Sequence, residues 1–435
     1  MINLILFGSF FVMLLLNIPI AVSLGMSSIF ALLYSGSALT VIPTNVYSGM
    51  AKFLLLAIPF FVLSGNIMAK AGISSRLVAF ADACVGHRRG GIAIVAVIVA
   101  CFFGAISGSG PATVAALGII LIPAMINRGG FSAPFASSLM ASASSIAIVI
   151  PPSIAFVVYA SITGVSVGDM FMGGWIPGIM MGLALVIIVM IECRKKGIQA
   201  SKAKSSWGQR WKSFREAFWG FLMPVIIIGG IYGGVFTPTE AAAVSVVYGL
   251  VVGVFIYREV KMKDMIDILV DSGKTTGGIM LIIGAATLFS YVCTVFGIAQ
   301  AAQALLLQIA GNKYIFLLIV NIIFLIAGCF VDANSAMYIF IPIMYPVATQ
   351  LGIDPVHFGV ISTVNLAIGQ VTPPVGVNLF VAIGVSEKLQ GLRDKTKVTI
   401  VSMSKAVWPQ IIACVITLLL VTYIPWFSTA LLFGK

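Results

Sequence analysis

A polar, glycine-rich segment constrains this fold more than any other part of the sequence. Residues 104–113 read Gly-Ala-Ile-Ser-Gly-Ser-Gly-Pro-Ala-Thr and interrupt a long apolar region, whose two outer ends are both closed by basic residues. The apolar runs on either side, 91–103 and 114–126, cover no more than roughly 23 Å each as helices, short of the ~30 Å hydrocarbon core. We therefore predict a re-entrant helical hairpin over about 91–127. Its tip is a candidate binding site, because irregular backbone at bilayer depth must be buried by protein or reached by water.

The composition indicates the class of protein. The chain has 435 residues, of which 60% are apolar and 9% are charged, and this excludes a soluble globular protein and predicts an all-α, polytopic protein of the lipid bilayer. The N-terminus has neither a basic n-region nor a small-residue cleavage site, so we expect no removable signal peptide. The six cysteines lack metal-type spacing, and we expect no cofactor other than coupling ions. The net charge of +12 is typical of basic cytoplasmic loops and does not indicate a nucleic-acid partner.

The chain divides into two halves. The first half contains scaffold helices over 1–52 and a repeat over 53–193, in which a helix of about 131–163 is broken by Pro151-Pro152. Residues 194–217 are a basic cytoplasmic linker, expected to lie on the membrane surface because Trp207 and Trp211 accompany its Lys and Arg residues. The second half contains scaffold helices over 218–274 and a repeat over 275–435. That repeat holds a second hairpin (about 313–349), a helix broken at Pro373-Pro374 (about 355–385) and a last span.

The two halves correspond to each other and point in opposite directions. Gly104 and Ser107 correspond to Gly328 and Asp332, and the spacing from Gly130 to Pro151 equals that from Gly352 to Pro373. Repeats with interrupted helices at matching positions are typical of secondary transporters. With the basic linker in the cytoplasm, all Lys and Arg residues fall on the cytoplasmic side except Lys52, Lys313 and Lys435, and the N-terminus is periplasmic. One hairpin then enters from each face, which makes the repeats inverted.

Oxygen-bearing residues gather at the tips and the breaks, where a sodium ion finds side-chain oxygens and freed carbonyls. Asp332 is the one carboxylate that this trace places at bilayer depth, and a carboxylate there indicates a functional site. The alternative for Asp332 is a hydrogen-bonded structural aspartate, and for Ser107 and Ser109 it is small-residue helix packing. The expected sodium ligands are Gly104, Ser107, Ser109 and Val149 in the first half, and Gly328, Asp332, Asn334, Gln370 and Thr372 in the second.

The substrate is expected between the two tips. Neither tip contains an arginine, so an anion there depends on neutral donors, on helix N-termini and on cations bound beside it. This predicts coupling, in which sodium first neutralises and orders the site and the anion then binds. The expected substrate contacts are Gly110, Thr113, Pro151, Ser153, Ser335, Pro373 and Asn378.

Other functions explain fewer of these features. An ion channel also uses re-entrant loops, although usually around an oligomeric pore axis. A serine protease needs a histidine base beside Ser107 or Ser109, whereas His87 and His357 are expected at the ends of loops. A non-transporting membrane scaffold leaves Asp332 and both proline pairs without a role.

Three motifs resemble the large membrane subunit of tripartite ATP-independent periplasmic (TRAP) transporters, within the wider ion-transporter superfamily. They are Gly-Ala-Ile-Ser-Gly-Ser over 104–109, Phe-Thr-Pro-Thr-Glu-Ala-Ala-Ala over 236–243 and the paired Pro-Pro breaks. The resemblance implies a multi-pass carrier of the bacterial inner membrane that imports an organic acid, of the sialic acid or C4-dicarboxylate class, with sodium and by an elevator movement. It also implies two partners, a small four-helix membrane subunit and a soluble periplasmic substrate-binding protein.

Overall fold

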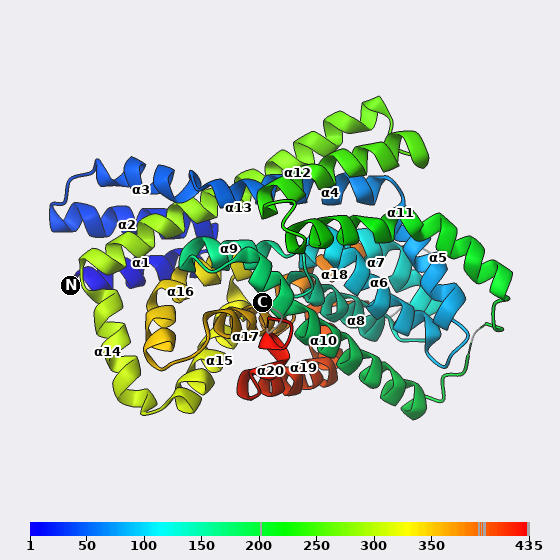
Figure 1. The fold of residues 1–435 in the computed structure, drawn as a ribbon. Helices are drawn as coiled ribbons and strands as arrows, with labels where there is room; N and C mark the ends of the chain where they lie inside the picture. Colours follow the sequence, from blue (N-terminus) through cyan, green and yellow to red (C-terminus); the bar gives the residue numbers. More distant parts are fainter. Residues whose placement is uncertain (201, 390–391, 393, 395–396, 433–435) are drawn as a thin grey trace.

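The computed structural model describes residues 1–200, 202–389, 392, 394 and 397–432, and this part of the chain contains helices and no strand. Lys435, one of the three lysines expected on the outer side, lies outside the described residues. Eight of the described helices are long and apolar enough to cross a membrane. The molecule is elongated, with the N-terminal helices at one end and α5 at the other (Figure 1). The all-helical membrane class predicted from the composition is therefore confirmed.

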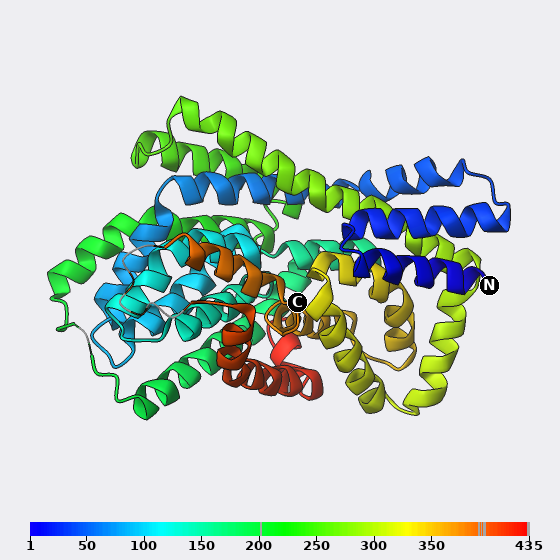
Figure 2. The same cartoon turned by 180° about the vertical axis from the view of Figure 1, so that it is seen from behind.

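A long helix, α13 (Met262–Val295), forms one side of the molecule and carries the N-terminal helices along it (Figures 1 and 2). Both α2 (Ile20–Ser35) and α3 (Val41–Met50) pack on α13, and α1 (Ile2–Leu15) packs on α2. A 3-10 turn, η1 (Phe53–Leu56), then leads into α4 (Ala57–Lys70), which also packs on α13. The close approach of α3 to α13 depends on glycine at position 49, since a Cβ atom there would lie 2.3 Å from Thr287 Oγ1.

The first hairpin consists of α6 (Gly91–Ser107) and α7 (Gly110–Asn127), which pack against each other. Gly108 turns the chain at the tip with a φ of 60°, a value that glycine adopts without steric cost. The helices are longer than the flanking apolar runs indicated, because the polar tip is itself helical up to Ser107 and again from Gly110. At 18 residues α7 is long enough to cross a membrane, so it is the reversal at the tip, and not helix length, that defines the hairpin.

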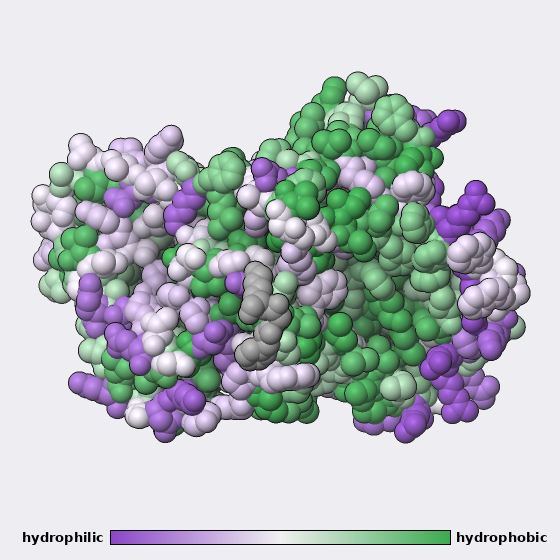
Figure 3. All heavy atoms as spheres, in the orientation of Figure 1, coloured by the Kyte–Doolittle hydropathy of each residue, from purple (hydrophilic) through white to green (hydrophobic). Residues whose placement is uncertain are grey.

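The broken helix after it consists of α8 (Ala133–Ser145), η2 (Ile146–Ile148) and α9 (Ile154–Thr163). The break spans residues 149–153, and the Pro151-Pro152 peptide bond is cis. The chain then continues into α10 (Val167–Lys195), a helix of 29 residues. Ile179, Leu183 and Ile187 form one exposed apolar stripe on α10. Figure 3 shows a large hydrophobic area on the surface of the molecule. Apolar surface on this scale fits contact with lipid.

The end of the basic linker differs from the expected surface helix. Helix α11 runs without interruption from Trp207 to Tyr232, so residues 207–217 are its first turns and not a separate element. Ser206 and Gln209 form a capping box that starts the helix there, and no proline follows before Pro224. The next helix, α12 (Pro238–Leu250), begins with a capping box between Thr237 and Glu240 and continues as the π-helical segment η3 (Val251–Ile256).

The second half repeats this order of elements. Its hairpin consists of α15 (Lys313–Phe330) and α16 (Ala333–Gln350), and its broken helix of α17 (Pro355–Gly369) and α18 (Val377–Glu387). The last span is α19 (Ile400–Tyr423), followed by the short α20 (Trp426–Thr429). Each hairpin is preceded by an amphipathic helix that the sequence analysis did not foresee, α5 (Ile73–Val85) before the first and α14 (Ile298–Ala310) before the second.

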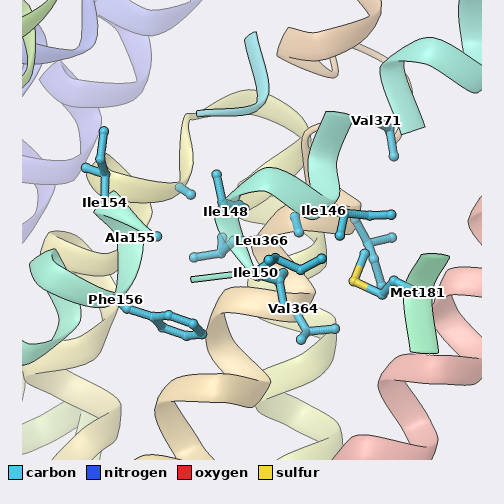
Figure 4. Close-up of a cluster of buried hydrophobic side chains, with 14 of the residues drawn as sticks. Ile146, Ile148, Ile150, Ile154, Ala155, Phe156, Met181, Val364, Leu366 and Val371 are labelled. Atoms are coloured by element: carbon cyan, nitrogen blue, oxygen red, sulfur yellow. The ribbon is translucent and has the colours of Figure 1, made fainter. Parts of the chain in front are cut away.

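The apolar core joins the two halves at their breaks. Ile146, Ile148 and Ile150 lie against Val364 and Leu366 of α17, and all five are buried (Figure 4). The first break is therefore held against the helix that leads to the second break. This packing places the irregular segments of both halves in the same region of the molecule.

Candidate functional site

The tips of the two hairpins meet at one cavity of about 530 Å³. One tip contributes Ser107, Ser109 and Gly110, and the other contributes Asp332 and Asn334. The opposite wall comes from α4 and α13, and Gln370 reaches the cavity from the second break. Two segments more than 200 residues apart in the sequence therefore form a single site. Asp332 is the only charged residue among the described residues that line it.

The first tip is a hydrogen-bonded turn. Thr113 Oγ1 donates to the Ser109 carbonyl oxygen at 2.8 Å, and Ser107 Oγ lies 2.8 Å from Thr113 Oγ1. Because the Thr113 proton is already used, the Ser107 hydroxyl donates to Thr113. A lone pair of Ser107 Oγ then remains for the Ser109 N–H at 3.4 Å and for a ligand.

The second tip places a carboxylate at the start of α16. Asp332 is the N-cap of α16 and accepts from the N–H groups of Asn334 (3.0 Å) and Ser335 (3.3 Å) through Oδ2. The Ser335 hydroxyl donates to its other oxygen, Oδ1. The Asn334 Oδ1 atom is buried and has no hydrogen-bond partner among the described residues. The tip thus combines one negative charge with one amide oxygen that is available to a cation.

Two further amide oxygens without partners come from the second break. Gln370 Oε1 and Asn378 Oδ1 are buried and accept no hydrogen bond within the described part of the chain. Both lie beside the first tip, since a Cβ atom built on Gly110 would be 2.8 Å from Gln370 Oε1 and 3.0 Å from Asn378 Oδ1, with Asn378 Nδ2 also at 2.8 Å. A buried polar atom without a partner costs about 1–3 kcal/mol. Two such oxygens beside one point form an environment that suits an oxygen-ligated cation.

Glycines bring each hairpin into backbone contact with the broken helix of its own half. A Cβ atom on Gly104 would lie 2.7 Å from Ala147 Cα, and one on Gly328 would lie 2.9 Å from Gly369 Cα. Neither Gly104 nor Gly328 lines the cavity. The structure therefore gives both glycines a packing position one turn or so behind the tip.

Several other residues expected at the site also lie behind the cavity wall. The Val149 carbonyl oxygen faces α10, where it would lie 2.4 Å from a Cβ atom on Gly174. Ser153 caps α9 and donates to the Ile148 carbonyl oxygen at 2.5 Å, and Thr372 donates to the Ile368 carbonyl oxygen at 2.8 Å. The expected residues that do not line the cavity are Gly104, Thr113, Val149, Pro151, Ser153, Gly328, Ser335, Thr372, Pro373 and Asn378.

The wall formed by α4 and α13 was missing from the expected site. It includes Gly65 and Asn66 on α4, and Thr275 and Ile279 on α13. Asn66 Nδ2 donates to Ser272 Oγ at 2.8 Å and so joins the two helices. An asparagine within an apolar span is a sequence signal that could have indicated this wall.

His357 occupies a different environment from the loop end expected for it. Its side chain is 3% exposed, with Nδ1 2.5 Å from Ser428 Oγ and Nε2 3.3 Å from the Thr422 carbonyl oxygen. The residue lies in the first turn of α17, which α20 and α19 cover. Ser107 bonds to Thr113 instead of a histidine, so the described residues contain no Ser–His pair at the tip.

Gly110→Ala tests the two amide oxygens beside the first tip. The new methyl group would occupy the space next to Gln370 Oε1 and Asn378 Oδ1, while the backbone of residue 110 has no positive φ that would strain an alanine. We expect folding to persist, because the neighbouring amide groups can rotate, and the sodium concentration for half-maximal uptake to rise at least about tenfold, the equivalent of ~1.4 kcal/mol. Sodium titration of uptake measures this. Gly8→Ala is the control, since nothing lies within 4 Å of its Cβ position; equal sodium dependence in both variants would contradict a cation beside Gly110.

Comparison with known proteins assigns the family. Residues 7–427 match the model of the tripartite ATP-independent periplasmic transporter, DctM component. The chain is 39% identical to the C4-dicarboxylate TRAP transporter large permease protein DctM of Rhodobacter capsulatus, over 98% of each chain. It is 34% identical to the sialic acid TRAP transporter large permease protein SiaM of Vibrio cholerae, over 92% of this chain and 91% of that one.

The fold is shared more widely than the sequence. The crystal structure of the Alcanivorax borkumensis YdaH transporter superposes with a TM-score of 0.62 at 15% identity, over 90% of this chain and 89% of that one. Together with the apolar helices, the family match confirms the resemblance found in the sequence. The chain belongs to the DctM family and is the large, multi-pass permease component of a tripartite ATP-independent periplasmic transporter of the bacterial inner membrane.

Proposed function

We propose that this permease is a sodium-coupled carrier that imports an organic acid of the C4-dicarboxylate or sialic acid class. The observation that carries the proposal is the cavity between the two hairpin tips, where Asp332 and the unpartnered amide oxygens of Asn334 and Gln370 lie together. Relatives named for C4-dicarboxylates, at 39–43% identity, and one named for sialic acid, at 34% identity, support these substrate classes.

The charge of the cavity supports sodium coupling. Among the described residues, the cavity wall contains the carboxylate of Asp332 and no Lys, Arg or His. A substrate carboxylate ~5 Å from Asp332 is repelled by about 3 kcal/mol at an effective dielectric constant near 20. A cation bound between the two carboxylates removes this repulsion. A bound sodium ion would therefore favour substrate binding, and this linkage is the basis of the proposed symport.

The donors for the substrate are expected at the start of α7. This helix begins at the first tip without a side-chain cap, and its first N–H groups and positive dipole end favour an anion. At the start of α16, by contrast, Asp332 already accepts from the N–H groups of Asn334 and Ser335. Alternating access requires the cavity to open to each face in turn. We propose that the hairpins move as an elevator against a scaffold that contains α4 and α13, because these two helices supply the wall opposite the tips.

TRAP large permeases work with a substrate-binding protein and a small membrane subunit. We propose that this chain pairs with a four-helix small subunit and receives its substrate from a soluble periplasmic protein. The exposed apolar surface of the molecule offers room for both lipid and a membrane partner (Figure 3).

Uptake into proteoliposomes tests the proposal. The permease is reconstituted with the small subunit and binding protein of its own operon, and the uptake of labelled succinate and of labelled sialic acid is measured with and without an inward sodium gradient. Accumulation of one acid only with sodium supports a symporter and names the substrate class. Flux that equilibrates without accumulation would instead support the channel alternative.

The inverted arrangement predicts opposite faces for the mouths of the two hairpins. Lys313 begins the second hairpin and Arg89 precedes the first, and both side chains are exposed. In intact cells, an impermeant thiol reagent should modify Lys313→Cys and not Arg89→Cys, whereas permeabilised cells should show modification of both. Modification of both cysteines from the same side would contradict the inverted arrangement.

A further inference from the structure

Three cavities follow one another along α13. The central cavity contacts α13 at Thr275 and Ile279. A second cavity of about 300 Å³ lies at the start of the helix and is lined by Asp264, Asp267 and Asp271. A third, of about 480 Å³, lies towards its end, at residues 287–294. At 1.5 Å per residue, Asp267 and Tyr291 are ~36 Å apart along the helix axis, so the second and third cavities lie on opposite sides of the hairpin tips.

The two outer cavities carry opposite charge. The cavity at the start of α13 has three aspartates and one lysine, Lys70. Within the described part of the chain, the third cavity has Lys52 as its only charged residue. Electrostatic attraction therefore favours cations at one side of the tips and anions at the other.

The ammonium group of Lys52 has N–H donors that remain available to a ligand. Its Nζ donates to the Ser161 carbonyl oxygen at 2.7 Å, which uses one of three N–H groups. The Lys52 side chain is exposed and forms no ion pair with a described carboxylate, and partial desolvation by its surroundings lowers its pKa below the ordinary value. Its surroundings lack the negative charge that a bound anion would supply.

Hydroxyl groups complete the lining around Lys52. Ser290 and Tyr291 of α13 and Tyr345 of α16 line this cavity, and their hydroxyl groups form no hydrogen bond with the described residues. Tyr338 is different, because its hydroxyl is paired with Ser161 Oγ at 2.9 Å. One ammonium group and three available hydroxyls, with no carboxylate among them, match the needs of a carboxylate ligand. The volume lies within the ~300–1,000 Å³ range of small-molecule sites.

We propose that this cavity is a second binding site for organic acids, where the carboxylate of an incoming substrate binds Lys52 before it reaches the hairpin tips. The proposal rests on the proposed function, since it concerns the same class of anion, and it adds a site that is independent of the sodium ligands. Its walls come from the segment around α3 on one side and from the end of α9 and from α16 on the other. The substrate would therefore bind between the scaffold and the second hairpin.

The uptake kinetics of Lys52 variants distinguish a role of Lys52 in substrate binding from a purely structural role. In reconstituted transporter, Lys52→Met should raise the KM for succinate about tenfold, as expected for loss of one charge-assisted contact, with kcat and the sodium half-saturation unchanged. Lys52→Arg should recover most of the affinity, and Lys313→Met, which removes a lysine outside the cavity, should behave as wild type. If Lys52 acts only by holding Ser161, Lys52→Met would change kcat and sodium dependence while leaving KM in place, and the proposal would be overturned.

Cysteine protection tests binding without transport. Thr294 is exposed and lines the cavity, and it can be replaced by cysteine after Cys84 and Cys101, the two partly exposed native cysteines, are changed to alanine. Millimolar succinate without sodium should slow modification of Thr294→Cys severalfold, and Lys52→Met should remove this protection. Modification of Ala301→Cys, on the exposed face of α14, should not respond to succinate.

The outcomes distinguish the two proposals. Normal sodium-driven uptake together with equal modification rates at Thr294→Cys, with and without succinate, overturns the second site alone. Protection that depends on Lys52 in a protein that accumulates neither acid keeps the site and overturns the transport proposal.

Discussion

Asp332→Asn is expected to raise the sodium concentration for half-maximal uptake about a hundredfold or more while the protein still folds. Asparagine retains an oxygen that can accept from the N–H groups of Asn334 and Ser335, so the cap of α16 persists. The negative charge is lost. Two unit charges ~4 Å apart interact by about 4 kcal/mol at an effective dielectric constant near 20, and part of this is offset by desolvation of the cation. Sodium titration of substrate uptake, with protein quantity in the membrane determined in parallel, measures the effect.

Asp354→Asn is the matched control for this experiment. Asp354 is also a helix N-cap, with Oδ1 accepting from the His357 N–H at 2.9 Å, but it is exposed and does not line the cavity. Its replacement should leave sodium dependence unchanged and alter stability by no more than about 1 kcal/mol. If Asp332→Asn gives the same small change in stability and an unchanged sodium titration, Asp332 is a capping residue and not a sodium ligand.

Gly328→Ala is expected to cause a large loss of stability. The new methyl group would lie 2.9 Å from Gly369 Cα, and the reciprocal methyl group in Gly369→Ala would lie 2.6 Å from Gly328 Cα. Both obstacles are backbone atoms, so α15 and α17 have to separate, and overpacking of this kind costs about 1–3 kcal/mol or more. We expect a lower melting temperature in detergent by tryptophan fluorescence, and loss of uptake, because the second tip is displaced from the cavity.

A glycine-to-alanine change at an uncrowded helix position is the control for the loss of stability in Gly328→Ala. Gly277 lies in the interior of α13, and nothing is within 4 Å of its Cβ position. Gly277→Ala should raise the stability by up to about 1 kcal/mol, since alanine favours a helix over glycine. A Gly328→Ala protein that melts at or above the wild-type temperature would show that the α15–α17 contact tolerates a methyl group, and the packing argument would then be wrong.

Local patterns were sufficient to predict the elements that form the site. The hairpins and the two broken helices followed from apolar runs interrupted by glycine, serine and Pro-Pro, because proline removes a backbone hydrogen bond and a glycine-rich polar segment in an apolar run favours irregular backbone. The capping box of Thr237 and Glu240 was likewise visible in four consecutive residues. The start of α11 at Trp207 could not be predicted from the local pattern, since a basic, tryptophan-containing stretch suits either a surface helix or the first turns of a long helix.

Tertiary packing decided which polar residues face the cavity. Ser107, Ser109, Gly110, Asp332, Asn334 and Gln370 lie there as expected, but Ser153 and Thr372 direct their hydroxyls to backbone carbonyls of their own segments. The direction of the Val149 carbonyl depends on the contact of its segment with α10, and the burial of His357 depends on α20, more than 60 residues away. Sequence spacing carries no information on either contact.

The sequence by itself determined the membrane class, the two interrupted hairpin units and the presence of one carboxylate at a tip, because hydropathy, helix breaking and charge are local properties of the chain. Only the tertiary structure decided that Gly110 of the first half meets Gln370 and Asn378 of the second. It also decided that α4 and α13 close the cavity and that Lys52 lies in a separate one. These features depend on contacts between segments up to about 270 residues apart, and such contacts are set by the packing of whole helices.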